Sequence, residues 1–163
     1  MACRETLIAY LWSNHVPFTV QAHRPTFTAR EVAATAHLPA LMIAKVVVVI
    51  ADERPAMLVL PASHRVSLRH VRDLLEARHV RLAEERELAT LFPDCSVGAT
   101  PPFGNLYGVQ VYVDSMIAAQ PKLVFQAGSH TETMTVSYAD FARLVRPWVA
   151  NVAGELREQR APA

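Results

Sequence analysis

The segment MIAKVVVVIADERPAMLVL, residues 42–60, determines the fold class that we expect for this chain. Its first part, residues 42–50, is the most strongly apolar run in the sequence. The length of this run and its β-branched side chains predict a central strand covered on both faces. Residues 52–55 have the composition of a turn, and residues 56–60 return as a second strand. The two strands therefore predict a β-hairpin.

Outside this hairpin, short helices and strands follow one another without a regular strand–helix repeat. A second hairpin is predicted over residues 122–127 and 133–136, joined by a turn at 128–130. Helical spacing and capping residues predict helices over residues 5–14, 28–38, 68–75, 84–92 and 138–145, a helix or turn over 114–119, and further strands over 16–20, 80–82 and 107–113. Hairpins interspersed with helices favour an α+β fold with a mixed, mostly antiparallel sheet.

The composition is that of one globular domain: the chain has 163 residues, of which 52% are hydrophobic and 19% charged. We expect this domain to span residues 1–150 and the charged stretch 151–163 to form a tail. The net charge of +1 excludes a strong global attraction to nucleic acid or membrane, so a nucleic-acid partner would need a local basic patch. No segment has membrane-spanning length and no targeting peptide is evident, which predicts a cytoplasmic protein with no membrane partner.

Cys3 and Cys95 are the only cysteines, too few for a disulfide framework and without metal-ligand spacing. The histidines show no paired-ligand motif, so we expect no metal site. A nucleophilic pair of Cys95 and His130 stays open from spacing alone. The alternative is that Cys95 is a free cysteine acting as a small buried hydrophobe.

A second notable segment, SVGATPPFGNLYGVQVYV, covers residues 96–113 and holds three of the five glycines and the pair Pro101-Pro102. Glycine lets the main chain approach a ligand closely, and proline restricts φ. A loop stiffened in this way, at the head of a predicted strand, can present main-chain amides with little ordering cost. An ordinary tight connection is the alternative.

Lys45 is a lysine at the head of a run of four valines, in a chain that otherwise uses lysine only at position 122. A buried ammonium is costly unless it meets an anion, so Lys45 either binds an anion or extends from the strand end into water. His130 lies in a predicted turn, where a solvated surface histidine and a functional one are both possible.

Arg65, Arg69 and Arg72 have the spacing of one helix face and form the best candidate for a phosphate-binding patch. Asp73 and Glu76 dilute this patch, and a solvated, ion-paired surface is the alternative explanation.

Taken together, Lys45 in its apolar strand, the Gly-x-x-x-Pro loop from Gly98 to Pro102 continuing as Phe103-Gly104, and the late Ala-Gly-Ser-His segment at 127–130 resemble the YbaK family. This family contains trans-editing aminoacyl-tRNA deacylases related to the insertion domain of bacterial prolyl-tRNA synthetase. The resemblance covers nearly the whole chain. It implies a mixed, mostly antiparallel sheet, curved around a pocket or forming a partial barrel, surrounded by helices.

The resemblance also implies an activity: hydrolysis of the ester that links a wrong, small amino acid to the 3′-terminal adenosine of a tRNA. Ala-tRNAPro is one candidate substrate. The expected partners are the mischarged tRNA and an aminoacyl-tRNA synthetase, and no cofactor, metal or protein nucleophile is implied. The alternative is a catalytically inactive module of the same fold that binds a tRNA or a synthetase.

The resemblance assigns roles to particular residues. Lys45 would bind the phosphate or ribose of the terminal adenosine, and His130 would line the amino-acid pocket or orient the substrate. The main chain of the loop would hold the ester carbonyl and its developing oxyanion; the loop residues are Gly98, Ala99, Thr100, Pro101 and Pro102. Further candidate substrate-binding residues are Val46, Phe103, Gly104, Gly128 and Ser129. Val46 stands where the alanine-specific branch typically has asparagine, so the amino acid stays open.

Overall fold

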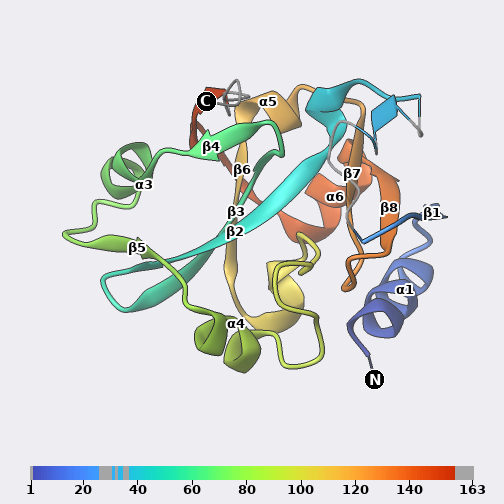
Figure 1. The fold of residues 1–163 in the computed structure, drawn as a ribbon, viewed down its shortest axis with the longest axis horizontal. Helices are drawn as coiled ribbons and strands as arrows, with labels where there is room; N and C mark the ends of the chain where they lie inside the picture. The colour runs from blue at the N-terminus through green and yellow to red at the C-terminus, as the bar shows by residue number, and fades with distance from the viewer. Residues whose placement is uncertain (1, 26–30, 32, 35–36, 157–163) are drawn as a thin grey trace, which may run out of the picture.

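The computed structural model describes residues 2–25, 31, 33–34 and 37–156, and within these ranges the chain forms an α+β fold of five α-helices and three sheets (Figure 1). The helices are α1 (Cys3–Ser13), α3 (Leu68–Leu74), α4 (Glu85–Leu91), α5 (Ser115–Ala118) and α6 (Tyr138–Val145), with 3-10 turns η1 (Ala40–Met42) and η2 (Gly104–Tyr107). The strands are β1 (Thr19–Ala22), β2 (Ala44–Ala51), β3 (Arg54–Pro61), β4 (His64–Val66), β5 (Val80–Leu82), β6 (Gln110–Asp114), β7 (Lys122–Gln126), β8 (Glu132–Ser137), β9 (Trp148–Ala150) and β10 (Ala153–Leu156).

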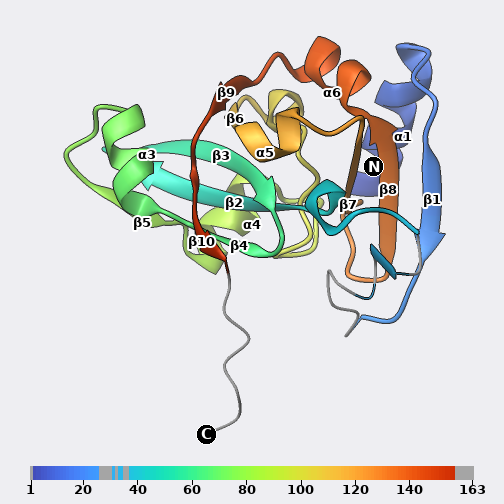
Figure 2. The same ribbon diagram turned by 90° about the horizontal axis from the view of Figure 1, so that it is seen from above.

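The largest sheet has the strand order β5-β2-β3-β6-β9, and separate sheets have the orders β1-β8-β7 and β10-β4. Only the pairs β3–β6 and β6–β9 are parallel. The predicted α+β class and mostly antiparallel pairing are therefore confirmed, but the sheets do not close into a barrel. Figure 2 shows β7, β8, β1 and α1 at one end of the molecule and α3 and β5 at the other.

The predicted hairpin is formed by β2 and β3, which pair from Ala44 opposite Pro61 to Ala51 opposite Arg54. Asp52 and Glu53 form its turn with φ angles of 45° and 71°, the left-handed conformation that two-residue hairpin turns require. The Asp52 carboxylate accepts main-chain hydrogen bonds from Arg78 and His79, which lower the pKa of Asp52.

Strand β2 is covered on both faces, as its uninterrupted apolar run predicts. Ala44 and Val48 belong to the larger core cluster, which α1, α6 and the three-stranded sheet complete. Val49 lies in a second cluster with Leu58 and Leu60 on the opposite face. Because successive strand residues face opposite sides, a strand with four consecutive valines can fill two cores at once.

Most predicted helices are confirmed, and three of them begin at capping residues: the side chains of Ser67, Asp114 and Ser137 accept hydrogen bonds from the first turns of α3, α5 and α6. Some details differ. Helical spacing predicts an apolar inner face for α3 that includes Leu68, Val71 and Leu74, but α3 buries only Val71, and Leu68 and Leu74 are exposed.

Three strand boundaries also differ from the sequence expectation. The strand expected from residue 107 begins at Gln110, since residues 104–107 form η2 and Gly108 has a φ of 69°. The strand expected at 16–20 instead spans Thr19–Ala22. Strand β10 lies within the stretch expected as a tail. The helix predicted over 28–38 falls largely outside the described residues. No helix in the described ranges is long and apolar enough to cross a membrane.

Cys3 and Cys95 form a disulfide with a Cα–Cα distance of 4.9 Å, so the expectation of a free Cys95 is wrong. The bond joins α1 to the segment that leads into the Gly98 loop. The Tyr107 hydroxyl lies 3.4 Å from Cys95 Sγ and donates a hydrogen bond of 3.1 Å to Asp94. Burial, together with the neighbouring Asp94 carboxylate, raises the pKa of Tyr107 to about 12.

The double substitution Cys3→Ala/Cys95→Ala should lower the free energy of unfolding by about 2–4 kcal/mol, because the disulfide closes a long loop of the unfolded chain. Urea denaturation monitored by circular dichroism measures this loss. The wild-type protein in dithiothreitol is the control and should lose the same amount, whereas the variant should not respond to the reductant. Equal stability of both proteins without reductant would contradict the prediction.

Candidate functional site

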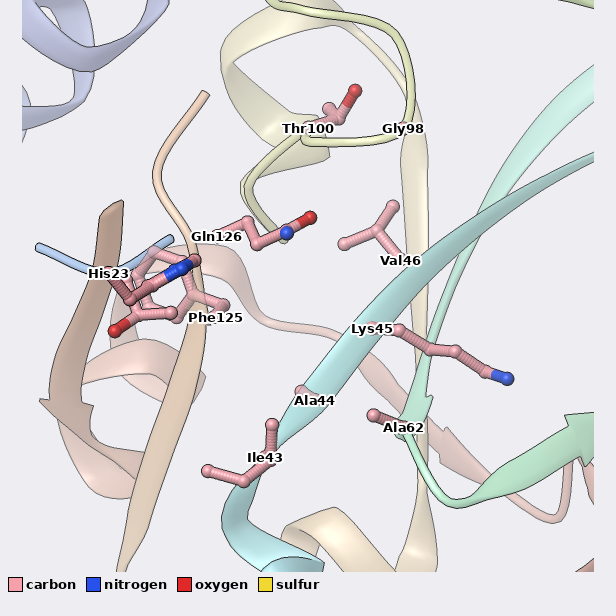
Figure 3. Close-up of a pocket in the computed structure, with 11 residues that line it drawn as sticks. His23, Ile43, Ala44, Lys45, Val46, Ala62, Gly98, Thr100, Phe125 and Gln126 are labelled. Atoms are coloured by element: carbon pink, nitrogen blue, oxygen red, sulfur yellow. The ribbon is translucent and has the colours of Figure 1, made fainter. Parts of the chain in front are cut away.

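A cavity of about 160 Å³ lies where the start of β2, the Gly98–Thr100 loop, strands β7 and β8 and the residue after β1 converge (Figure 3). Its lining is mostly apolar with a few polar groups, as is usual for small-molecule sites. The lining residues are His23, Ile43, Ala44, Lys45, Val46, Ala62, Gly98, Thr100, Phe125, Gln126 and Thr133. Among the residues expected from sequence, the structure therefore brings Lys45, Val46, Gly98 and Thr100 together.

Lys45 and Val46 contribute to this site from opposite faces of β2. Val46 is directed toward the Gly98 loop, whereas Figure 3 shows the Lys45 side chain extending away from Phe125 and Gln126. Adjacent residues of a strand alternate in this way. Lys45 consequently lines the cavity and also a groove on the other face of β2, which it shares with Arg65.

The loop is held in place by three main-chain hydrogen bonds. Ala99 N–H donates to Ser96 O at 3.0 Å, Ser96 N–H to Gly128 O at 3.1 Å, and Gly128 N–H to Ala99 O at 2.9 Å. Gly98 has a φ of +82°, a conformation that other residues adopt only with strain. The loop is thus fixed before any ligand arrives.

The main-chain donors of this loop are few, because Pro101 and Pro102 carry no N–H. Ala99 N–H is already used within the loop. The N–H groups of Gly98 and Thr100 have no hydrogen-bond partner among the described residues, and both residues line the cavity. Two donors are therefore available at the cavity wall for a carbonyl or an oxyanion.

His130 lies behind the loop instead of lining the cavity. Its Nε2 is 2.8 Å from Val97 O, and a Cβ built on Gly98 would lie 3.4 Å from His130 Cε1. Gly128 is packed against Cys3, where an added Cβ would lie only 2.8 Å from Sγ. His130, Gly128 and Ser129, expected to contact substrate, are absent from the cavity lining because their segment supports the loop from behind.

Five other expected site residues also lie outside the lining. Phe103 is fully buried in an aromatic cluster, with its ring centroid 5.6 Å from Phe125 and 5.7 Å from Phe141. At Gly104 an added Cβ would lie 2.7 Å from Val109 O, so this glycine is required by packing. Ala99, Pro101 and Pro102 are buried, and they shape the loop without touching the cavity.

The cavity also contains residues that sequence analysis missed, notably His23, Phe125, Gln126 and Thr133. Gln126 and Thr133 are paired across the β7–β8 hairpin. Figure 3 shows the Gln126 amide directed from β7 toward the space between Val46 and the loop. A polar residue ending an apolar strand was the only sequence signal for Gln126.

Two alternatives raised by the sequence are corrected. Arg65 lies on β4, whereas Arg69 and Arg72 lie on α3 beyond the Ser67 cap, so the three do not share one helix face. Cys95 is bonded to Cys3 and offers no thiol to His130, which excludes the cysteine nucleophile in this structure. Within the described ranges, no group of three or more His, Cys, Asp or Glu side chains is placed to hold a metal ion.

Comparison with known proteins identifies the family. Residues 23–144 match the aminoacyl-tRNA editing domain. The chain belongs to the aminoacyl-tRNA editing domain family. This match includes Lys45, the Gly98–Pro102 loop and His130, the residues on which the resemblance to the YbaK family rested.

Solved structures share the fold of this editing domain. A crystal structure described as "a putative trans-editing enzyme for prolyl tRNA synthetase" superimposes with a TM-score of 0.82 at 18% identity, over 95% of this chain and 99% of that one. The crystal structure of "hypothetical protein APE2540" gives 0.79 at 21% identity, over 91% and 99%. No curated protein matches the chain.

Gly98→Ala should lower the free energy of unfolding by about 1–2 kcal/mol, because alanine is strained at this φ. The substitution should also shift the NMR signals of the His130 imidazole, since the added methyl group contacts that ring. Gly108→Ala is the matched control: its φ is +69°, but nothing lies within 4 Å of the added methyl group. It should cost similar stability and leave the His130 signals in place. Identical imidazole spectra for the two variants would show that the loop does not rest on His130.

Proposed function

We propose that this editing domain is a free-standing deacylase that hydrolyses the ester between a small amino acid and the 3′-terminal adenosine of a mischarged tRNA. One observation carries the proposal. The N–H groups of Gly98 and Thr100 have no partner among the described residues, and both residues line a cavity of amino-acid size together with Val46 and Gln126. The family match and the shared fold support it.

The size of the cavity favours a small substrate. Its volume of about 160 Å³ is close to that of a protein cavity that accommodates benzene, about 150 Å³. An alanyl, seryl, threonyl or cysteinyl group is of this scale. Discrimination by size alone supplies only about 1–3 kcal/mol per methylene, which is why a hydrolytic second sieve is useful in translation.

The proposed chemistry needs placement and charge stabilisation more than a protein nucleophile. Water adds to the ester carbonyl carbon, and the carbonyl oxygen becomes an oxyanion that Gly98 N–H and Thr100 N–H stabilise. The C–O bond to the ribose then breaks, and the proton that the attacking water loses passes to the leaving ribose oxygen, which gives the free amino acid and the ribose hydroxyl of the tRNA. One preorganised main-chain donor of this kind contributes about 3 kcal/mol. By resemblance to the family, the neighbouring ribose hydroxyl helps to position the water.

Lys45 and Val46 lie on opposite faces of β2 and have different proposed roles. The Lys45 ammonium lies on a flexible stem at the rim and is suited to the phosphate of the terminal adenosine. Val46 places methyl groups in the cavity where the alanine-specific branch has an amide. Alanine is therefore one candidate among several, and the polar groups of Gln126, Thr100 and Thr133 are available to the substrate ammonium or side chain.

Lys45→Ala should reduce kcat/KM for the preferred mischarged tRNA by about 10- to 100-fold, the value of one lost charge-assisted hydrogen bond. A panel of tRNAs carrying alanine, serine, threonine or cysteine, assayed for amino-acid release, measures the effect. Lys122→Ala is the control, because Lys122 is the only other lysine and is exposed on β7. Equal rates for the two variants, or no release from any tRNA, would refute the proposal.

A second candidate function is a binding module that recognises charged tRNA or a synthetase without hydrolysis. The direction of the Lys45 side chain, away from Gln126 and Phe125, favours it. Tight binding of charged tRNA without ester loss would select this function. Either function would place the protein with the translation machinery in the cytoplasm, beside a synthetase.

A further inference from the structure

We propose that the cavity continues around the edge of β2 into a groove that binds the unpaired nucleotides preceding the terminal adenosine of the tRNA. This inference rests on the proposed function and names the path by which the RNA leaves the site. The groove lies on the opposite face of β2 from the cavity and has a volume of about 380 Å³; it is lined by Lys45, Val47, Arg65, Val66, Leu68 and Leu82.

The cavity and the groove are connected through shared residues. Lys45 lines both of them. A third hollow of about 180 Å³ shares Val46, Gly98 and Thr100 with the cavity, and Val47 and Leu82 with the groove. A ligand larger than one nucleoside can therefore follow a continuous depression from the loop to Arg65.

This continuous depression exists because the edge of β2 that faces β5 is only partly paired. Strand β5 pairs with β2 only from Val49 to Ala51, whereas β3 pairs with it from residue 44. Ala83 N–H donates to Val48 O, so the main chain of Val48 faces away from β3. Main-chain groups two residues apart in a strand point the same way. The N–H and C=O groups of Val46 therefore face the open edge that the ligand would cross.

The groove has the chemistry of a single-strand binding site. Lys45 and Arg65 supply positive charge, and Leu68 and Leu82 add apolar surface that is 37% and 54% exposed. Unpaired nucleic acid is bound by cations along its phosphates and by apolar surface under its bases; here leucines, and no aromatic rings, supply that surface. No acidic side chain lines the groove.

Arg65 is also the arginine best placed to meet a phosphate. Among the described residues no carboxylate forms an ion pair with Arg65. The neighbouring Arg81, by contrast, is held by Glu87 through hydrogen bonds of 2.6 and 3.0 Å. A phosphate arriving at the groove would meet the charge of Arg65 without displacing a carboxylate.

The charge-reversal variant Arg65→Glu tests this path, with Arg54→Glu as the matched control. Arg54 is exposed at the hairpin end of β3 and lines neither the cavity nor the groove. With mischarged tRNA, Arg65→Glu should raise KM by about tenfold and leave kcat unchanged. The slope of log KM against the logarithm of the salt concentration should fall by about one, the value for one lost phosphate contact. With an aminoacyl ester of adenosine alone, Arg65→Glu and wild type should be equal. Leu82→Glu should behave as Arg65→Glu does.

Binding of a fluorescent single-stranded RNA ending in ACCA separates this inference from the proposed function. If wild type hydrolyses mischarged tRNA but Arg65→Glu matches Arg54→Glu in both KM and RNA binding, the groove is overturned and the deacylase stands. If no ester is hydrolysed, but Arg65→Glu weakens RNA binding and Arg54→Glu does not, RNA binding by the groove is supported and the deacylase proposal is overturned. An equal effect of Arg65→Glu on the adenosine ester would also overturn the groove.

Discussion

The hydrogen bonds between the Ser96–Ala99 main chain and Gly128 hold the candidate site together. They fasten the loop that carries the two available donors to the β7–β8 turn. Gly128 must lack a side chain because the Cys3 sulfur occupies the space where a Cβ would lie. The disulfide, the Tyr107 hydroxyl beside it and the His130 ring all lie around this loop, so covalent, polar and packing contacts restrain the same few residues. Preorganisation of this kind is what main-chain stabilisation of an oxyanion requires.

Strand β2 has to satisfy two demands at once. Its valines fill the cores on both of its faces, and its first residues form a wall of the cavity. The strand can do both because β5 is short and pairs only with residues 49–51, which leaves the main chain of Val46 at an open edge. An unpaired edge is usually a liability, since it invites other strands. Here the charged side chain of Lys45 lies beside this edge, and charge is one of the devices that keep an edge strand from pairing with other chains.

Local rules predicted much of the fold from sequence. The β2–β3 hairpin, the capped helices expected over residues 68–75 and 138–145 and the short strand β5 each depend on neighbouring residues, and these predictions are confirmed. Features that depend on long-range contacts were not accessible. Cys3 and Cys95 are separated by 92 residues, and nothing in their spacing indicates that α1 lies beside the loop.

The candidate site was likewise predictable only where local sequence carries a signal. The proline–glycine loop and the lysine of β2 could be identified because their residue types are unusual in their places, and the structure puts them around one cavity. Strand alternation, by contrast, sends Val46 and not Lys45 toward the loop. Gln126 and Thr133 meet the cavity only because β7 and β8 are packed beside β2, a contact that no local pattern encodes.

The balance of charge explains why recognition has to occur at short range. With a net charge of +1, the protein exerts little long-range attraction on a polyanion, and several surface arginines are already neutralised by carboxylates. At an ionic strength near that of the cell, the Debye length is about 8 Å, so only cations that touch the RNA contribute. Lys45 and Arg65 line one groove that adjoins the cavity. Under the proposed function, binding of the tRNA end would be weak and its release quick, and selectivity would depend on the fit of the aminoacyl group.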